Sequence, residues 1–309
     1  MKYAIVFPGQ GSQSLGMLSD LNDNFSIVKD TFTEASDALG FDLWALTQED
    51  QEALNQTQNT QPAMLAAGYA TYKVLTSQSD LSPVCMAGHS LGEYTALVAS
   101  GALGFSDAIK LVRTRAQLMQ SAVPAGVGAM AAILGLDDEV VVKVCGDYAG
   151  EGIVQAVNFN SNGQVVIAGN KAAVDATCEA MKAAGAKRAV VLPVSVPSHC
   201  SLMDDAAGEF KHAVDALDFN MGSVDVLHNV DASKAADINE MKAKLVAQLH
   251  KPVLWTGTVR AMHAMGVEKL IEAGPGKVLA GLTRRIEKSL SANAVLDSAG
   301  VASALEEIK

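Results

Sequence analysis

The chain has 309 residues, and 34 acidic against 23 basic side chains give it a net charge of −11. Hydrophobic residues make up 49% of the chain and charged residues 18%, a composition that excludes intrinsic disorder. Because the chain is acidic and has no run of Lys or Arg, we do not expect it to bind nucleic acid. Its four cysteines lack zinc or redox spacing, and neither a signal peptide nor a membrane span is expected. We therefore expect a cytoplasmic protein, without a metal site, that acts as a monomer.

Short apolar segments alternate with helical patterns in the first part of the chain. The first apolar segment ends at Pro8-Gly9-Gln10-Gly11, and the helical pattern that begins near Gln61 carries Pro62 in its first turn, where proline is tolerated. The predicted strands span 2–7 and 84–87, and the main predicted helices span 61–77, 91–100 and 106–123.

A block with a different order of elements follows, and we place it at residues 125–196. Asn170 is expected to cap the start of its second helix, and Gly185 lies just past the end of that helix. The pattern predicts strands at 128–135, 153–160, 164–168 and 187–194, with helices at 137–149 and 170–184. This β-α-β-β-α-β order is typical of a ferredoxin-like unit.

Strand–helix alternation resumes after the insertion, with strands predicted at 224–230 and 269–273. Alternation of this kind indicates an α/β fold with a mostly parallel sheet. We therefore predict a core made of residues 1–124 and 197–309, with the small unit inserted between the two parts.

The segment Gly88-His89-Ser90-Leu91-Gly92 matches G-x-S-x-G, the nucleophile elbow, in which a tight strand-to-helix turn exposes a serine hydroxyl. The alternative is an ordinary glycine-rich turn whose serine caps the next helix. A nucleophilic serine needs a base. His89 is adjacent to the serine and points elsewhere, whereas His199 lies where the insertion rejoins the core, and we take it as the candidate.

Arg115 stands out on the helix predicted at 106–123. At about 100° per residue, this arginine lies near the middle of the apolar half of the helix, whereas Arg113 faces solvent. A buried guanidinium requires an anion, because an unpaired buried charge is strongly destabilising. The anion is either a protein carboxylate or the carboxylate of a ligand, for which arginine offers two-pronged hydrogen bonding.

Several motifs together resemble the malonyl-CoA:acyl carrier protein transacylases of bacterial fatty-acid synthesis, over essentially the whole chain. The resemblance rests on Phe7-Pro8-Gly9-Gln10-Gly11-Ser12-Gln13, Gly88-His89-Ser90-Leu91-Gly92-Glu93, Arg115, Val196-Pro197-Ser198-His199 and Glu272-Ala273-Gly274-Pro275-Gly276. It implies an α/β-hydrolase-like core with a ferredoxin-like subdomain and an active site in the gorge between them. It also implies a ping-pong transfer of malonyl from malonyl-CoA to the phosphopantetheine thiol of acyl carrier protein, with no cofactor of the enzyme's own.

The same resemblance assigns roles to individual residues. Ser90 would be the nucleophile, His199 its general base, and the Gln248 backbone carbonyl would orient the histidine. Arg115 would bind the malonyl carboxylate. The backbone N–H groups of Gln10 and Leu91 would form the oxyanion hole, and Asn160 and Gln164 would line the gorge from the subdomain.

Three other interpretations remain open on the sequence. A serine esterase or thioesterase with the same Ser-His pair predicts an acidic triad member, for which Asp137, Asp138, Asp147 and Asp175 are available. A carrier-binding protein without activity and a Cys200 nucleophile are the other two. For an acidic carrier we expect a local basic docking patch. The candidates are Lys182, Lys187 and Arg188, or Arg284, Arg285 and Lys288.

Overall fold

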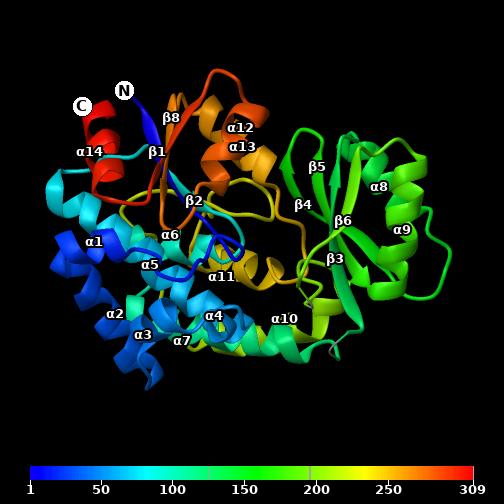
Figure 1. The fold of residues 1–309 in the computed structure, drawn as a ribbon, viewed down its shortest axis with the longest axis horizontal. Helices are drawn as coiled ribbons and strands as arrows, with labels where there is room; N and C mark the ends of the chain where they lie inside the picture. The colour runs from blue at the N-terminus through cyan, green and yellow to red at the C-terminus, as the bar shows by residue number, and fades with distance from the viewer. Residues whose placement is uncertain (125, 195, 309) are drawn as a thin grey trace.

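Two β-sheets organise the chain and lie side by side in Figure 1. The structure, a computed structural model, describes residues 1–124, 126–194 and 196–308. The larger sheet has five parallel strands in the order β7-β2-β1-β8-β9. These strands are β1 (Tyr3–Phe7), β2 (Met86–Gly88), β7 (Val226–Leu227), β8 (Lys269–Ala273) and β9 (Ser291–Val295).

Helices cover both faces of this sheet, as the alternation of side chains along β1 requires. Tyr3, Ile5 and Phe7 point into one buried cluster with α5, α6 and α7, and Ala4 and Val6 point into a second cluster with α12 and α13. The helices of this part are α1 (Ser19–Asn24), α2 (Ser26–Leu39), α3 (Leu43–Glu49), α4 (Gln51–Leu54), α5 (Thr57–Gln78), α6 (Gly92–Ala99), α7 (Phe105–Ser121), α10 (Asp204–Asp215), α11 (Ile238–Ala247), α12 (Trp255–Ala264), α13 (Val278–Ile286) and α14 (Ser298–Glu307). None of the described helices combines the length and apolar character needed to cross a bilayer.

The smaller sheet has four antiparallel strands in the order β4-β5-β3-β6, and it forms the right-hand part of Figure 1. In chain order its elements are β3 (Gly128–Leu134), α8 (Asp138–Gly146), β4 (Val154–Ser161), β5 (Gln164–Asn170), α9 (Lys171–Ala183) and β6 (Arg188–Val191). The β-α-β-β-α-β order predicted from the sequence is therefore confirmed, as is the α/β class with a parallel main sheet. Helices α8 and α9 cover one face, and the face that carries Met130 turns toward the core.

Backbone hydrogen bonds attach the smaller sheet to the core along β4. The N–H of Val253 donates to the carbonyl of Val157 at 2.8 Å, and the N–H of Phe159 donates to that of Val253 at 3.0 Å. At the β4–β5 turn, Asn162 accepts from Arg260 and donates to the carbonyl of Arg285. Ala125, where the predicted insertion begins, lies outside the described residues. The division at 125–196 stays a prediction.

Three sequence predictions of elements need correction. Helix α5 begins at Thr57, four residues before Gln61, because Thr60 and Asn59 bond back to the carbonyls of the preceding turn and anchor the helix start there. Pro62 is therefore inside the helix rather than in its first turn. Strand β2 begins two residues later than predicted and ends one residue later. Strand β9 was not predicted, since Ser291-Ala-Asn-Ala-Val has a single β-branched residue and no aromatic residue to mark it as a strand.

Candidate active site

Ser90 lies at the tip of a tight turn between β2 and α6. Its backbone has a φ of 50°, in the left-handed region that non-glycine residues rarely adopt. The glycines on either side are required by close approach. A Cβ on Gly88 would lie 1.9 Å from the carbonyl carbon of Gly92, and a Cβ on Gly92 would lie 2.1 Å from the carbonyl oxygen of Phe7. The turn thus has the geometry of a nucleophile elbow, which holds the serine hydroxyl clear of its neighbours.

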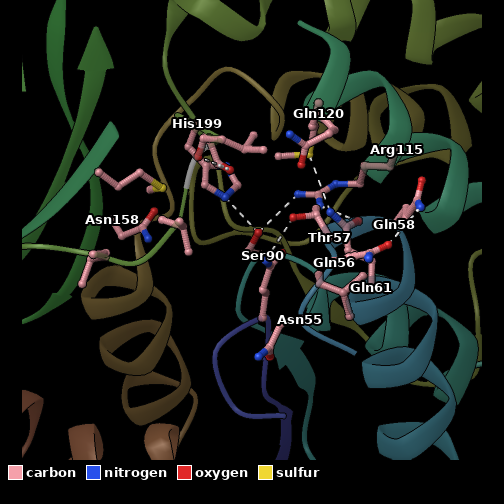
Figure 2. A pocket seen from close by; sticks show the side chains of 18 of the residues that line it. Asn55, Gln56, Thr57, Gln58, Gln61, Ser90, Arg115, Gln120, Asn158 and His199 are labelled. Carbon is pink, nitrogen blue, oxygen red and sulfur yellow. Dashed lines mark hydrogen bonds between the residues drawn. The ribbon is translucent and has the colours of Figure 1, made fainter. Parts of the chain in front are cut away.

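The hydroxyl of Ser90 is hydrogen-bonded to the imidazole of His199, as Figure 2 shows. The Oγ–Nε2 distance is 2.8 Å, and Nδ1 of His199 lies 2.6 Å from the backbone carbonyl of Gln248. Because a carbonyl only accepts, Nδ1 carries the proton, and Nε2 is left as the acceptor for the Ser90 hydroxyl. Within the described parts of the chain, no carboxylate bonds to His199. The acidic triad member that an esterase predicts is therefore not in contact with this base.

Burial controls the protonation of His199, which is only 3% exposed. Removal from water lowers its pKa to about 3, and the positive charge of Arg115 also lowers it, whereas the bond to the Gln248 carbonyl acts in the opposite direction. The imidazole is therefore neutral at physiological pH, as a general base must be.

Arg115 is buried beside the serine, as its place on the helical wheel predicts, with 1% of its surface exposed. Its Nη2 donates to Ser90 Oγ at 3.2 Å and to Gln248 Oε1 at 2.9 Å, and its Nη1 donates to Gln61 Oε1 at 2.8 Å. In the regions that the structure covers, no ion pair joins it to a carboxylate. Its charge is thus available to an anion that enters the site.

The sequence prediction for Arg113 was only partly right. Its guanidinium does not simply face solvent, because it stacks on the ring of Phe41, with 4.8 Å between the guanidinium carbon and the ring centroid. The helical wheel separates the two arginines correctly but cannot show that α2 and its flanking loop cover part of the outer face of α7.

A cavity of about 520 Å³ opens above Ser90, between the core and the smaller sheet. Gln10 and Leu91 lie in its wall beside the serine. Among the hydrogen bonds of the described residues, neither of their backbone N–H groups has a protein acceptor. Two unused donors next to a nucleophile are what an oxyanion hole requires. No group of metal-ligating side chains comes together within the described residues.

Asn160 and Gln164 do not line this cavity, contrary to the sequence prediction. Asn160 Oδ1 lies 2.7 Å from Nε2 of His89, so its amide is occupied in holding that ring. Gln164 follows the β4–β5 turn, where its Oε1 accepts from Arg285 of α13 at 3.4 Å. Among the subdomain residues that line the cavity, the polar one is Asn158, whose buried amide oxygen has no partner in the described chain. Figure 2 shows it across the cavity from Arg115.

The sequence reasoning also missed three residues that hold the site together. Gln61 accepts from Arg115, and Asn229 Oδ1 accepts from the N–H of Ser90 at 2.7 Å. Glu93 is a fully buried carboxylate in the first turn of α6. Glu93 had a signal, since a charged residue follows directly on the elbow motif in a helix that is otherwise apolar. The other two lie far from the motif in sequence and carried none.

Comparison with known proteins agrees with this geometry. Residues 4–304 match the model of the acyl transferase domain family. The malonyl CoA-acyl carrier protein transacylase of Escherichia coli K12 is 53% identical over 306 residues, which cover 99% of both chains. That of Bacillus subtilis is 43% identical over 100% of this chain and 98% of its own. The chain belongs to the malonyl CoA-acyl carrier protein transacylases.

Solved structures of the same family superpose over the whole transacylase. An acyl carrier protein S-malonyltransferase from Vibrio cholerae has a TM-score of 0.96 and 55% identity, with full coverage of both chains. A malonyl-transacylase in complex with a type II PKS acyl-carrier protein has a TM-score of 0.98 and 51% identity, and it covers 99% of this chain and 100% of its own. The likeness extends to both sheets, and therefore includes the cavity between them.

Proposed function

We propose that this enzyme transfers the malonyl group from malonyl-CoA to the phosphopantetheine thiol of an acyl carrier protein through an ester on Ser90. The observation that carries the proposal is the position of the Ser90 hydroxyl, which lies 2.8 Å from a neutral imidazole and 3.2 Å from an arginine without a carboxylate partner. A nucleophile beside a fixed cation suits an acyl group that bears its own carboxylate. A simple esterase has no use for such a cation.

In the first half-reaction, Arg115 would hold the malonyl carboxylate while His199 takes the proton of Ser90. The serine then attacks the thioester carbonyl, and the oxyanion forms against the N–H groups of Gln10 and Leu91. Removal of one such donor typically costs about 3–4 kcal/mol in catalysis. The proton on His199 passes to the departing sulfur of coenzyme A. A thiolate leaves readily, and a base oriented by a carbonyl rather than by a carboxylate suffices for it.

In the second half-reaction, the thiol of the carrier protein would enter the same cavity, lose its proton to His199 and attack the malonyl ester, and His199 would return that proton to the departing Ser90 oxygen. The malonyl ester must meanwhile be kept from water, or the enzyme would become a hydrolase. Phosphopantetheine belongs to the carrier, and the enzyme needs no cofactor of its own for these steps. The reaction is expected in the cytoplasm, where a carrier protein and malonyl-CoA are both available.

A two-step mass measurement tests this function. Brief mixing with malonyl-CoA should add one malonyl group to the intact protein, and addition of carrier protein with a free phosphopantetheine thiol should remove it and malonylate the carrier. Steady release of coenzyme A without an adduct or carrier product would instead indicate a thioesterase. No adduct and no release would exclude malonyl-CoA as the substrate.

The pH dependence of the first half-reaction should reflect the low pKa of His199. With its pKa lowered from the usual 6.5 to about 3, the base remains neutral throughout the mildly acidic range. We therefore expect kcat/KM for malonyl-CoA to be nearly constant from pH 8 down to about pH 5 and to fall only below it. An acidic limb centred at pH 6.5 or above would contradict this assignment. In the unfolded chain this histidine has its usual pKa of 6.5, so it is protonated at a higher pH than in the folded enzyme. Protonation therefore favours the unfolded chain, and the free energy of unfolding falls as the pH drops below 6.5.

Reversal of one surface charge should separate the two half-reactions. Arg284 is exposed at the end of α13, and its change to Glu should lower kcat/KM for the carrier protein about tenfold, because the docking of an acidic partner depends on local positive charge. Acylation by malonyl-CoA should be unchanged. Arg285 is a poorer choice because it also contacts Gln164. Lys29→Glu, on α2, is the matched control, and equal carrier kinetics in both variants would exclude this patch.

A further inference from the structure

A buried carboxylate that the proposed mechanism does not use lies beneath the active site. Glu93 is fully buried, and both of its oxygens accept hydrogen bonds. Oε1 accepts from Nδ1 of His228 at 2.7 Å, and Oε2 accepts from the backbone N–H of Asn229 and from Nε2 of Gln248, each at 2.9 Å. A carboxylate removed from water is costly unless an opposite charge balances it.

The positive charge linked to Glu93 is that of Arg115, and the side-chain amide of Gln248 separates the two. The side chain of Gln248 lies between them, with Nε2 on the Glu93 carboxylate and Oε1 on Nη2 of Arg115, each at 2.9 Å. Nε2 also donates to the backbone carbonyl of Ser90 at 2.9 Å, and because a carbonyl and an ionised carboxylate only accept, the two together fix which end of the amide faces the arginine. An amide turned the other way would point its N–H groups at a guanidinium. Glu93 and the Ser90 carbonyl therefore ensure that Arg115 has an acceptor in the empty site.

We propose that Glu93 is a positioning residue that acts on Arg115 through Gln248. It limits how strongly this site prefers malonyl to uncharged acyl groups. In the empty enzyme its charge balances the buried guanidinium. When a malonyl group binds, Arg115 interacts with two carboxylates, that of Glu93 and that of the substrate. The substrate is therefore bound less tightly than it would be if Glu93 carried no charge. Moderate binding of the malonyl group favours turnover, because strong binding of the malonyl ester would slow its transfer to the second thiol.

This inference rests on the proposed malonyl transfer, and Glu93→Gln tests it because the change removes the charge and can keep the hydrogen bonds. The amide oxygen of the new side chain can accept from Asn229 and Gln248. Its N–H₂ group can donate to His228, whose Nδ1 becomes an acceptor when the proton moves to Nε2. That nitrogen now has no partner in the described chain, so the exchange breaks no bond there. Gln248 keeps its orientation, and only the counter-charge is lost.

The matched control is Glu272→Gln. Glu272, on β8, is also a fully buried carboxylate, and its oxygens accept from the backbone N–H groups of Leu279 and Ala280, away from the cavity. Both variants place an amide where a buried carboxylate was, so a general effect of that change on stability appears in both. Only Glu93→Gln changes the charge beside Arg115.

The measurement is acylation in mixtures of malonyl-CoA and acetyl-CoA, followed by intact mass, which gives the ratio of the two kcat/KM values. We expect Glu93→Gln to raise the malonyl-to-acetyl ratio about fivefold and Glu272→Gln to leave it as in the wild type. An unchanged or lower ratio in Glu93→Gln overturns the proposal. If that variant does not fold, Glu93→Asp replaces it. Aspartate is one methylene shorter, so its carboxylate lies farther from Gln248 and Arg115. The malonyl-to-acetyl ratio should then rise about twofold, and a fall in this ratio overturns the proposal. A wild type that takes up no malonyl group would refute the function itself, a separate outcome.

Discussion

Ser90→Ala should abolish the malonyl adduct and lower malonyl transfer by about 10⁴-fold or more, the size of effect seen when the nucleophile of a Ser-His enzyme is removed. The Ser90 hydroxyl donates to His199 Nε2 at 2.8 Å and accepts from Arg115 Nη2 at 3.2 Å. The alanine variant keeps the elbow, because the backbone of residue 90 is held by Asn229 and Gln248 rather than by its hydroxyl. Intact mass after mixing with malonyl-CoA is the measurement.

A control at Cys200 makes this result specific. Cys200 follows the candidate base and is the nucleophile of a competing interpretation, yet its thiol is buried, and burial raises its pKa to about 11. Cys200→Ser should therefore keep the adduct. A malonyl adduct that survives in Ser90→Ala and disappears in Cys200→Ser would reverse the assignment.

Much of the site could be predicted because its residues carry local signals. Gly88 is required for a steric reason that acts within five residues, and Gly92 because the turn packs against the backbone of Phe7, but both glycines belong to one short motif that reveals the elbow. Arg115 was found because one charge on an apolar helix face is visible in the period of a single helix. The order of strands and helices is similarly local, and it predicted both sheets.

The residues that the sequence did not reveal act through contacts between distant segments. Asn158 and Asn160 occupy the same strand with the same chemistry, and their difference arises because His89, more than sixty residues earlier, lies against one of them. The 2.9 Å bond from Gln248 to Glu93 joins positions 155 residues apart. Helix α5 begins earlier than predicted because polar side chains at its start bond to the preceding turn. In each case the partner, not the residue type, decides the role.

Arg115→Met should reverse the substrate preference of the enzyme. Loss of one partner from a buried charged contact typically costs about 2–5 kcal/mol, so we expect kcat/KM for malonyl-CoA to fall at least about 30-fold, whereas that for acetyl-CoA should change much less. The variant keeps an unbranched apolar stem and removes the guanidinium. Arg113→Met, on the same helix but stacked on Phe41 outside the cavity, is the control and should retain the wild-type preference.

The same substitution should also shift the pH profile, which distinguishes a charge effect from a loss of packing. The positive charge of Arg115 lowers the pKa of His199, second only to burial, so its removal should raise that pKa and move the acidic limb of kcat/KM to higher pH. A profile unchanged in Arg115→Met would show that the arginine does not act on the base. In the wild type a malonyl carboxylate bound to Arg115 would offset the same charge and make His199 a stronger base. A charged substrate would then benefit in two ways from its contact with Arg115. The arginine binds it, and its own negative charge restores the basicity of the group that activates Ser90, whereas an acetyl group does neither.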